Sequence, residues 1–163
     1  MKTHIMIILL MLFSITLITP QNKNAVISEL KNNEVSIKLH RLIDFNSSSV
    51  KSGYKFLVAD ITIENTSGKS IEMGAEYTMS ITIKDANGNE YRSGLKGAGI
   101  VSSYLAKNGN DEQDQKAYNL CFSDNFPAKT KARSLLCGFE VPKDAQIVSF
   151  GVKKKNMWSD LKK

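Results

Sequence analysis

Apolar and polar residues alternate along most of the chain, a period of two that is typical of β-strands with one buried face. The clearest example runs from Tyr54 to Asn65, where Leu57, Ala59 and Ile61 share one face. The same alternation predicts further strands over residues 35–45, 77–84, 90–92, 118–122, 135–141 and 148–152. Helical periodicity is almost absent, so about seven short strands indicate an all-β fold, an antiparallel β-sandwich.

Turn and loop signals separate these strands. Asn87 and Gly88 favour the positive φ angles of a tight type I′ turn, which predicts a β-hairpin at this point. Two longer stretches, 93–99 and 107–116, are glycine-rich or polar and are expected to be loops, with a short helix over 102–106 between them. Loops that project from a rigid sandwich commonly carry binding residues.

The amino terminus has the order of features of an export signal. Lys2 supplies a positive charge, and an apolar run extends from Ile5 to Ile18 and ends before Pro20. This run is shorter than the roughly 20 apolar residues that a membrane-spanning helix needs. We therefore expect residues 1–21 to form a signal helix that contacts the membrane only transiently, with cleavage between residues 19 and 25. An uncleaved anchor is the alternative.

The remainder of the chain is long enough for one domain. We expect a linker over residues 22–33, the sandwich over 34–155 and a C-terminal tail over 156–163. The whole chain carries 22 Lys and Arg against 16 Asp and Glu, a formal net charge of +6. Because the basic residues are spread along the chain and interleaved with acidic ones, the charge suits contact with anionic envelope surfaces and does not indicate nucleic-acid binding.

Three phrases of the sequence carry a family resemblance. They are YKFLVADITIENTSGKSI from Tyr54, YTMSITIKDANGNEY from Tyr77 and FPAKTKARSLLCGFEVPKDAQIVSFGV from Phe126. Together they resemble a bacterial extracellular immunoglobulin-like domain of unknown function that is related to secreted immunoprotective antigens. The resemblance covers roughly residues 54–153 and implies an immunoglobulin-like sandwich outside the cytoplasm. It carries over no catalytic residues, and Pro127 stands near a position where the family often has Gly.

Few side chains of the chain suit catalysis. His4 lies in the expected signal, which leaves His40 as the one histidine of the mature chain, and no GxSxG nucleophile motif occurs. His40 falls on the polar face of an expected strand, so a surface position is the simpler interpretation. We expect the protein not to be an enzyme.

Cys121 and Cys137 are the sharpest pair of candidate residues. Outside the cytoplasm two cysteines are more often bridged than free, and a loop of about 15 residues would contribute on the order of 3 kcal/mol to stability. Cys137 aligns with the apolar residues Leu135 and Phe139, whereas Cys121 falls opposite the apolar set of its own segment. A disulfide is favoured, with two buried thiols as the alternative.

Two weaker candidate sites are charged. Asp111, Glu112 and Asp114 offer oxygen ligands of the kind that calcium takes, although their spacing does not match an EF-hand and a solvated loop is the simpler interpretation. Six basic residues could form a patch for an anionic partner, or could protect an edge strand with charge. They are Lys129, Lys131, Arg133, Lys153, Lys154 and Lys155.

These features lead to a functional expectation. We expect a secreted or periplasmic, monomeric, non-enzymatic immunoglobulin-like domain without a cofactor, which acts at the cell envelope as a binding module for a protein, a glycan or a lipid headgroup. An envelope enzyme or metal-binding protein that uses residues 107–116, and an inhibitor of an extracellular enzyme, are the alternatives. Function has to be argued from a site, so it depends on which residues the fold brings together.

Overall fold

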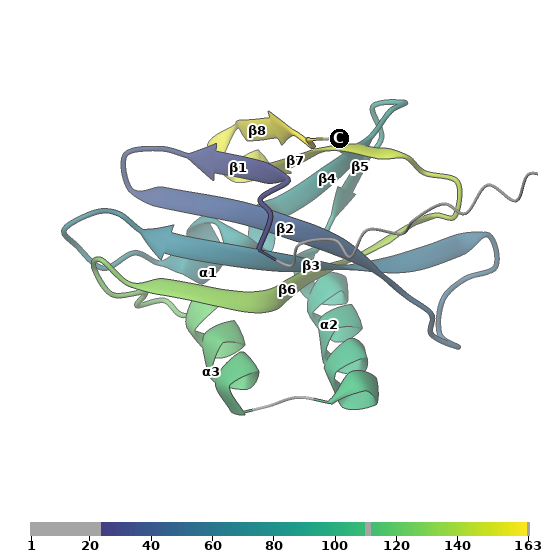
Figure 1. Cartoon of the computed structure of the whole chain (residues 1–163), viewed down its shortest axis with the longest axis horizontal. Coiled ribbons are helices and arrows are strands. Elements are labelled where there is room, and N and C mark those ends of the chain that lie inside the picture. The colour runs from purple at the N-terminus through teal and green to yellow at the C-terminus, as the bar shows by residue number, and fades with distance from the viewer. Residues whose placement is uncertain (1–23, 110–111, 163) are drawn as a thin grey trace, which may run out of the picture.

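The computed structural model describes residues 24–109 and 112–162, so the predicted signal at residues 1–21 lies outside the described residues. The described chain forms two four-stranded antiparallel sheets (Figure 1). The first sheet has the strand order β1 (Ser28–Lys31), β2 (Val35–Phe45), β3 (Tyr54–Asn65) and β6 (Lys131–Pro142). The second has the order β5 (Glu90–Arg92), β4 (Ile81–Asp85), β7 (Ile147–Val152) and β8 (Met157–Asp160). The prediction of a β-rich, antiparallel fold is confirmed.

Strand β3 is central in the first sheet and follows the clearest sequence pattern. It pairs antiparallel with β2 on one side and with β6 on the other. Ile61 and Ile63 are fully buried in the core, as the alternation predicted. Asp60 and Thr62 point to the opposite face because successive side chains of a strand alternate. This outer face carries one of the two sites described below.

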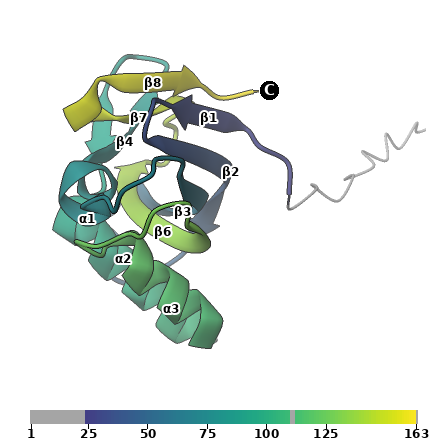
Figure 2. The same cartoon turned by 90° about the vertical axis from the view of Figure 1, so that its left-hand side faces the viewer.

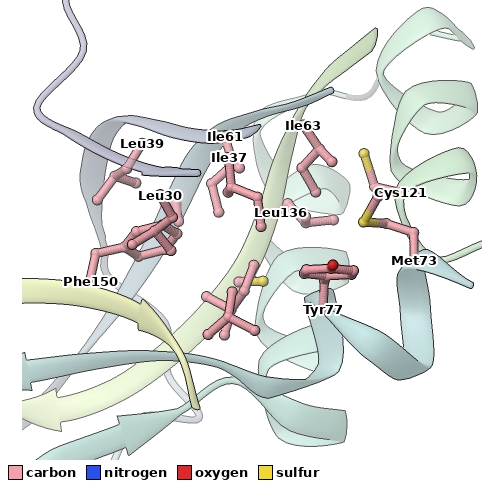
Figure 3. Packing of buried hydrophobic residues seen from close by; sticks show 14 of the residues in the cluster. Leu30, Ile37, Leu39, Ile61, Ile63, Met73, Tyr77, Cys121, Leu136 and Phe150 are labelled. Carbon is pink, nitrogen blue, oxygen red and sulfur yellow. The ribbon is translucent and has the colours of Figure 1, made fainter. Parts of the chain in front are cut away.

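The main core fills the space between the two sheets. Ile61 and Leu136 of the first sheet belong to the same buried cluster as Phe150 of the second. At its other end the cluster reaches Tyr77 and Cys121, beside the helices (Figure 3). Residues far apart in the sequence therefore share one core, as expected for a packed pair of sheets.

Helix α2 (Gly94–Asn108) corrects the prediction that residues 93–99 form a loop. Its buried residues follow helical spacing and are Gly97, Ile100, Val101 and Leu105. A Cβ atom at Gly97 would lie 2.4 Å from the carbonyl oxygen of Gly138 in β6, so only glycine permits this approach. The glycine that suggested a turn is in fact a packing residue of a helix.

Helix α3 (Glu112–Cys121) corrects two further predictions, a loop over residues 107–116 and a strand over 118–122. Its apolar residues Ala117, Leu120 and Cys121 pack against the main core. Over so short a segment the helical spacing was mistaken for alternation. Figure 2 shows α2 and α3 together on the side of the molecule away from β8. Among the described residues, no helix is long and apolar enough to cross a membrane.

The segment before β4 also differs from the prediction. The 3-10 turn η1 (Thr78–Ser80) occupies positions where a strand was expected from residue 77, and helix α1 (Met73–Glu76) precedes it. The strand begins only at Ile81. Met73 is fully buried in the main core, so burial rather than sheet pairing explains part of the apolar pattern here.

The hairpin that joins β4 to β5 is confirmed, but its turn is of another type. Gly88 has a φ of +85°, whereas Asn87 is not in the positive-φ region that a type I′ turn requires at both central positions. The Asp85 carboxylate holds the turn by accepting hydrogen bonds from the backbone N–H groups of Asn87 and Asn89, each at 2.9 Å.

Two short strands occupy segments that were expected to be a linker and a tail. Strand β1 lies within residues 22–33 and β8 within residues 156–163. They come together at one side of the sandwich, where the backbone N–H of Lys162 donates to the carbonyl of Ile27 at 2.7 Å (Figure 2). The two sheets are thus joined on this side, while α2 and α3 cover the side of β6.

Candidate functional site

The structure divides the predicted basic patch between two clefts. Arg133 lies in β6 and lines a cleft on the outer face of the first sheet. Lys153 and Lys154 belong to the 3-10 turn η2 (Lys153–Lys155), which follows β7, and they line a second cleft. Lys129 and Lys131 line neither of these two clefts. The six residues therefore do not all line one cleft.

A buried aspartate lies at the centre of the first cleft. The Asp60 side chain is only 7% exposed and lies between Arg41 of β2 and Arg133 of β6. Arg41 donates from Nε to Oδ2 at 3.0 Å. Arg133 donates from Nε to Oδ1 at 2.9 Å and from Nη2 to Oδ2 at 3.1 Å. This two-point contact is a strong way for a guanidinium to hold a carboxylate. We call these three residues the Asp60 cluster.

The charged groups of the Asp60 cluster are paired with one another. Burial by itself would raise the pKa of Asp60, but the hydrogen bonds and charges of Arg133 and Arg41 outweigh it and hold the pKa below its usual value. Arg133 also donates from Nη1 to the side-chain oxygen of Asn24 at 2.9 Å. The cluster thus ties β2, β3, β6 and the N-terminal segment together, which indicates a structural role.

His40 lies on the same outer face and corrects the prediction of a surface position. It is 8% exposed and stands at a β-bulge of β2, next to Arg41. Its Nδ1 atom lies 3.0 Å from the carbonyl oxygen of Ala25, and its Nε2 atom lies 2.8 Å from the hydroxyl of Thr62. His40 therefore helps to hold the N-terminal segment against the sheet.

The second cleft has a basic lining and a volume of about 280 Å³. Its lining residues are Ala75, Ser80, Arg92, Lys153 and Lys154. We call these five residues the basic cleft. Strand β4 brings its two sides together, because Thr82 pairs with Arg92 of β5 on one side and with Gly151 of β7 on the other. Residues about 60 positions apart in the sequence thereby face one hollow.

Glu90 of β5 holds one edge of the basic cleft. Its carboxylate lies 2.5 Å from the ammonium group of Lys153 and 3.4 Å from that of Lys84. The hydrogen bond from Lys153 lowers the pKa of Glu90 most strongly. Arg92 donates from Nε to the carbonyl of Met79 at 3.1 Å, which fixes its guanidinium at the cleft.

Glu76 of α1 holds the opposite edge in the same way. Its two oxygens lie 2.7 Å from Lys154 and 2.5 Å from Lys155. The hydrogen bonds from Lys154 and Lys155 lower the pKa of Glu76 to about 2. Each glutamate is thus shared by two lysines. Four lysines share the two carboxylates, and Arg92 adds a fifth positive charge at the cleft, so this region keeps an excess of positive charge.

The acidic residues predicted as calcium ligands lie only partly within the described residues, so the calcium site stays a prediction. Asp111 lies outside the described residues, and Glu112 is the first residue of α3. Asp114 lines the first cleft. Within residues 24–109 and 112–162, no group of three or more His, Cys, Asp or Glu side chains could hold a metal ion.

Cys121 and Cys137 are buried free thiols, which corrects the predicted disulfide. Cys121 ends α3, whereas the Sγ atom of Cys137 faces the carbonyl oxygen of Thr78 at 3.7 Å. Cys137 has a φ of +60° at a β-bulge, and this bulge shifts the strand so that Leu136 instead of Leu135 enters the core. Burial raises the pKa of both thiols to about 12.

The sequence interpretation missed most partners of both clefts. Asp60 had a detectable signal, since a charged residue interrupts the hydrophobic stretch of the strand most certain to be buried. Arg92, Glu76 and Glu90 had none. Arg92 and Glu90 reach the turn η2 only through the strand order of the second sheet, and Glu76 of α1 reaches Lys154 and Lys155 through contacts between segments far apart in the sequence.

Comparison with known proteins bears on the fold. No family model and no curated protein matches the chain. A solved structure is similar, the crystal structure of a conserved hypothetical protein from Bacillus anthracis, with a TM-score of 0.58 and 14% sequence identity. The match covers 85% of this chain and 94% of that one. At this identity the likeness concerns the fold alone.

Proposed function

We propose that this protein is an exported, non-enzymatic, immunoglobulin-like β-sandwich that binds an anionic partner at the cell envelope through the basic cleft. The imbalance of charge there carries the proposal. Arg92, Lys153 and Lys154 line a hollow of about 280 Å³. The two carboxylates beside it, Glu90 and Glu76, are each shared by two lysines. A hollow lined by one sign of charge focuses the field and attracts ions of the opposite sign.

The state of the candidate catalytic groups supports binding over catalysis. Burial raises the pKa of Cys121 and Cys137 to about 12, so both remain protonated at neutral pH. The thiolate is the nucleophilic form of cysteine, so neither residue suits nucleophilic catalysis. Both ring nitrogens of His40 lie within hydrogen-bond distance of the Ala25 carbonyl and the Thr62 hydroxyl.

Sequence and architecture support the remaining parts of the proposal. The apolar run from Ile5 to Ile18 after Lys2 favours export. Two four-stranded antiparallel sheets around a shared core are compatible with an immunoglobulin-like sandwich. An envelope location would expose the basic cleft to anionic glycans and lipid headgroups.

The proposal is tested by removing charge from the basic cleft. The double variant Lys153→Gln/Lys154→Gln should bind immobilised dextran sulfate about thirtyfold more weakly than the wild type at low salt, since each lysine near an anionic surface contributes about 1 kcal/mol. The matched control Lys116→Gln/Lys143→Gln removes the same charge from α3 and from the β6–β7 turn. Equal weakening by both double variants would contradict the proposal, because the cleft would then have no special role.

A further inference from the structure

The outer face of the second sheet carries a tryptophan in line with the basic cleft. The strand register places Arg92, Thr82, Gly151 and Trp158 in one row across β5, β4, β7 and β8. Neighbouring strands lie about 4.8 Å apart, so the two ends of the row are separated by roughly 14 Å. The row therefore begins at the guanidinium of Arg92 in the cleft and ends at the indole ring of Trp158.

The ring of Trp158 stacks on the sheet because Gly151 has no side chain. A Cβ atom at Gly151 would lie 2.4 Å from Cε3 and 2.6 Å from Cδ2 of the ring. Trp158 is half-buried, so part of the ring faces solvent. A partly exposed indole held against a sheet is a pre-organised contact surface, since little side-chain freedom is lost on binding.

Lys84 connects this ring to the basic cleft. Its ammonium group lies 4.3 Å from the centre of the Trp158 ring and 3.4 Å from the carboxylate of Glu90. The same carboxylate holds Lys153, which lines the cleft. The Trp158 ring is thus followed along the row by the cations Lys84, Lys153 and Arg92.

We propose that this face binds an acidic polysaccharide, with a sugar ring that displaces the Lys84 ammonium group from the Trp158 ring and with acidic groups on Lys84, Lys153 and Arg92. The inference rests on the proposed function of the basic cleft and names the class of its ligand. The face of an aromatic ring carries partial negative charge, which attracts the polarised C–H groups of a pyranose ring. Carboxylates spaced along a uronic acid chain match cations spaced along the row. A single lipid headgroup would use the cleft alone and leave Trp158 without a contact.

The chain contains one tryptophan, so its fluorescence reports on this face directly. Titration of the full chain with polygalacturonate should change the Trp158 emission to a saturating level, and high salt should reverse the change. Methyl-esterified pectin, which lacks most of the charge, should give no saturating change.

Variants separate stacking from charge. Trp158→Ala should weaken polygalacturonate binding about tenfold in calorimetry, and Trp158→Phe should retain most of the affinity because a flat ring remains. Lys84→Gln should weaken binding several-fold. Urea unfolding of each variant checks that the fold is kept, and Lys116→Gln serves as a matched charge control for Lys84→Gln.

Two results would overturn the polysaccharide inference and leave the basic cleft in place. One is polygalacturonate binding that depends on Lys153 and Lys154 but leaves the emission unchanged and is the same for Trp158→Ala. The other is tighter binding of phosphatidylglycerol vesicles, or of a single-stranded oligonucleotide that stacks on the ring, than of polygalacturonate. Failure of dextran sulfate and polygalacturonate alike to bind would overturn both proposals.

Discussion

The Asp60 cluster and the basic cleft are built from the same kinds of residue and differ in burial. The Asp60 side chain is 7% exposed and is held by two arginines, whereas the Glu90 side chain is 30% exposed and is held by two lysines. A planar guanidinium satisfies a buried carboxylate at two points, while a strongly hydrated ammonium group suits an exposed pair. Desolvation and the choice of cation, rather than the number of charges, separate a cluster that holds the fold from one that can receive a ligand.

The largest effect should come from breaking the Asp60 cluster. Asp60→Asn leaves two guanidinium groups at a partly buried site without their carboxylate, which should lower the free energy of unfolding by about 3 kcal/mol. Urea unfolding measures the loss. The matched change Glu90→Gln in the basic cleft should shift the urea midpoint far less, because its carboxylate is exposed. Equal shifts for the two variants would remove the distinction between the clusters.

The contribution of Asp60 to the free energy of unfolding should depend on pH. The pKa of Asp60 is lowered in the folded protein, so its contribution is complete above the usual aspartate pKa of about 4 and is lost as the pH falls through the lower folded value. The difference in unfolding free energy between wild type and Asp60→Asn should therefore be constant near neutral pH and narrow below about pH 4. A difference that grows on acidification would contradict this account.

A smaller effect is expected when the charge is kept and the two-point contact is lost. Arg133→Lys should lower the free energy of unfolding by on the order of 1 kcal/mol, because an ammonium group cannot reproduce the paired hydrogen bonds to Asp60. Lys153→Arg, the reverse exchange in the basic cleft, should leave the thermal midpoint unchanged. Thermal unfolding of both variants checks the comparison, and a stable Arg133→Lys protein would argue against the two-point contact as a source of stability.

The smallest effect on stability should come from removing the two lysines of the basic cleft, the change expected to weaken anion binding most. Lys153→Gln/Lys154→Gln should unfold at the same urea concentration as the wild type, because exposed ion pairs contribute little to stability. Compared with Asp60→Asn, this variant then shows that one cluster affects stability and the other affects anion binding. A marked loss of stability in the lysine variant would mean that the basic cleft is also structural.

The sequence predicts the parts of the fold in which an apolar–polar pattern or a turn signal extends over enough residues to be recognised. Strand β3 is 12 residues long and alternates strictly from Ala59 to Glu64, and the β4–β5 hairpin follows its turn residues. Strands β1 and β8 have only four residues each, too few for a pattern. Helix α2 was missed because Gly97, needed for contact with Gly138, resembles a loop signal when the partner strand is not known.

The candidate sites were readable only in part. The run Lys153 to Lys155 is visible as positive charge in the sequence, and its role as a patch for an anionic partner stays a prediction. Whether such a run faces Arg92 or Arg133 depends on which strands pair, and the hydrogen-bonded order β5-β4-β7-β8 cannot be inferred from local composition. The same limit applies to Trp158, whose ring meets Lys84 only because β8 folds back beside β7.

The salt dependence of dextran sulfate binding tests the central claim most directly, because each cation that contacts a polyanion releases bound counterions. For the wild type, log K should fall linearly with log salt, and Lys153→Gln/Lys154→Gln should reduce the slope by about two. Lys116→Gln/Lys143→Gln should leave the slope at the wild-type value. The claim that the basic cleft is the anion-binding site would be contradicted if the two double variants gave the same slope.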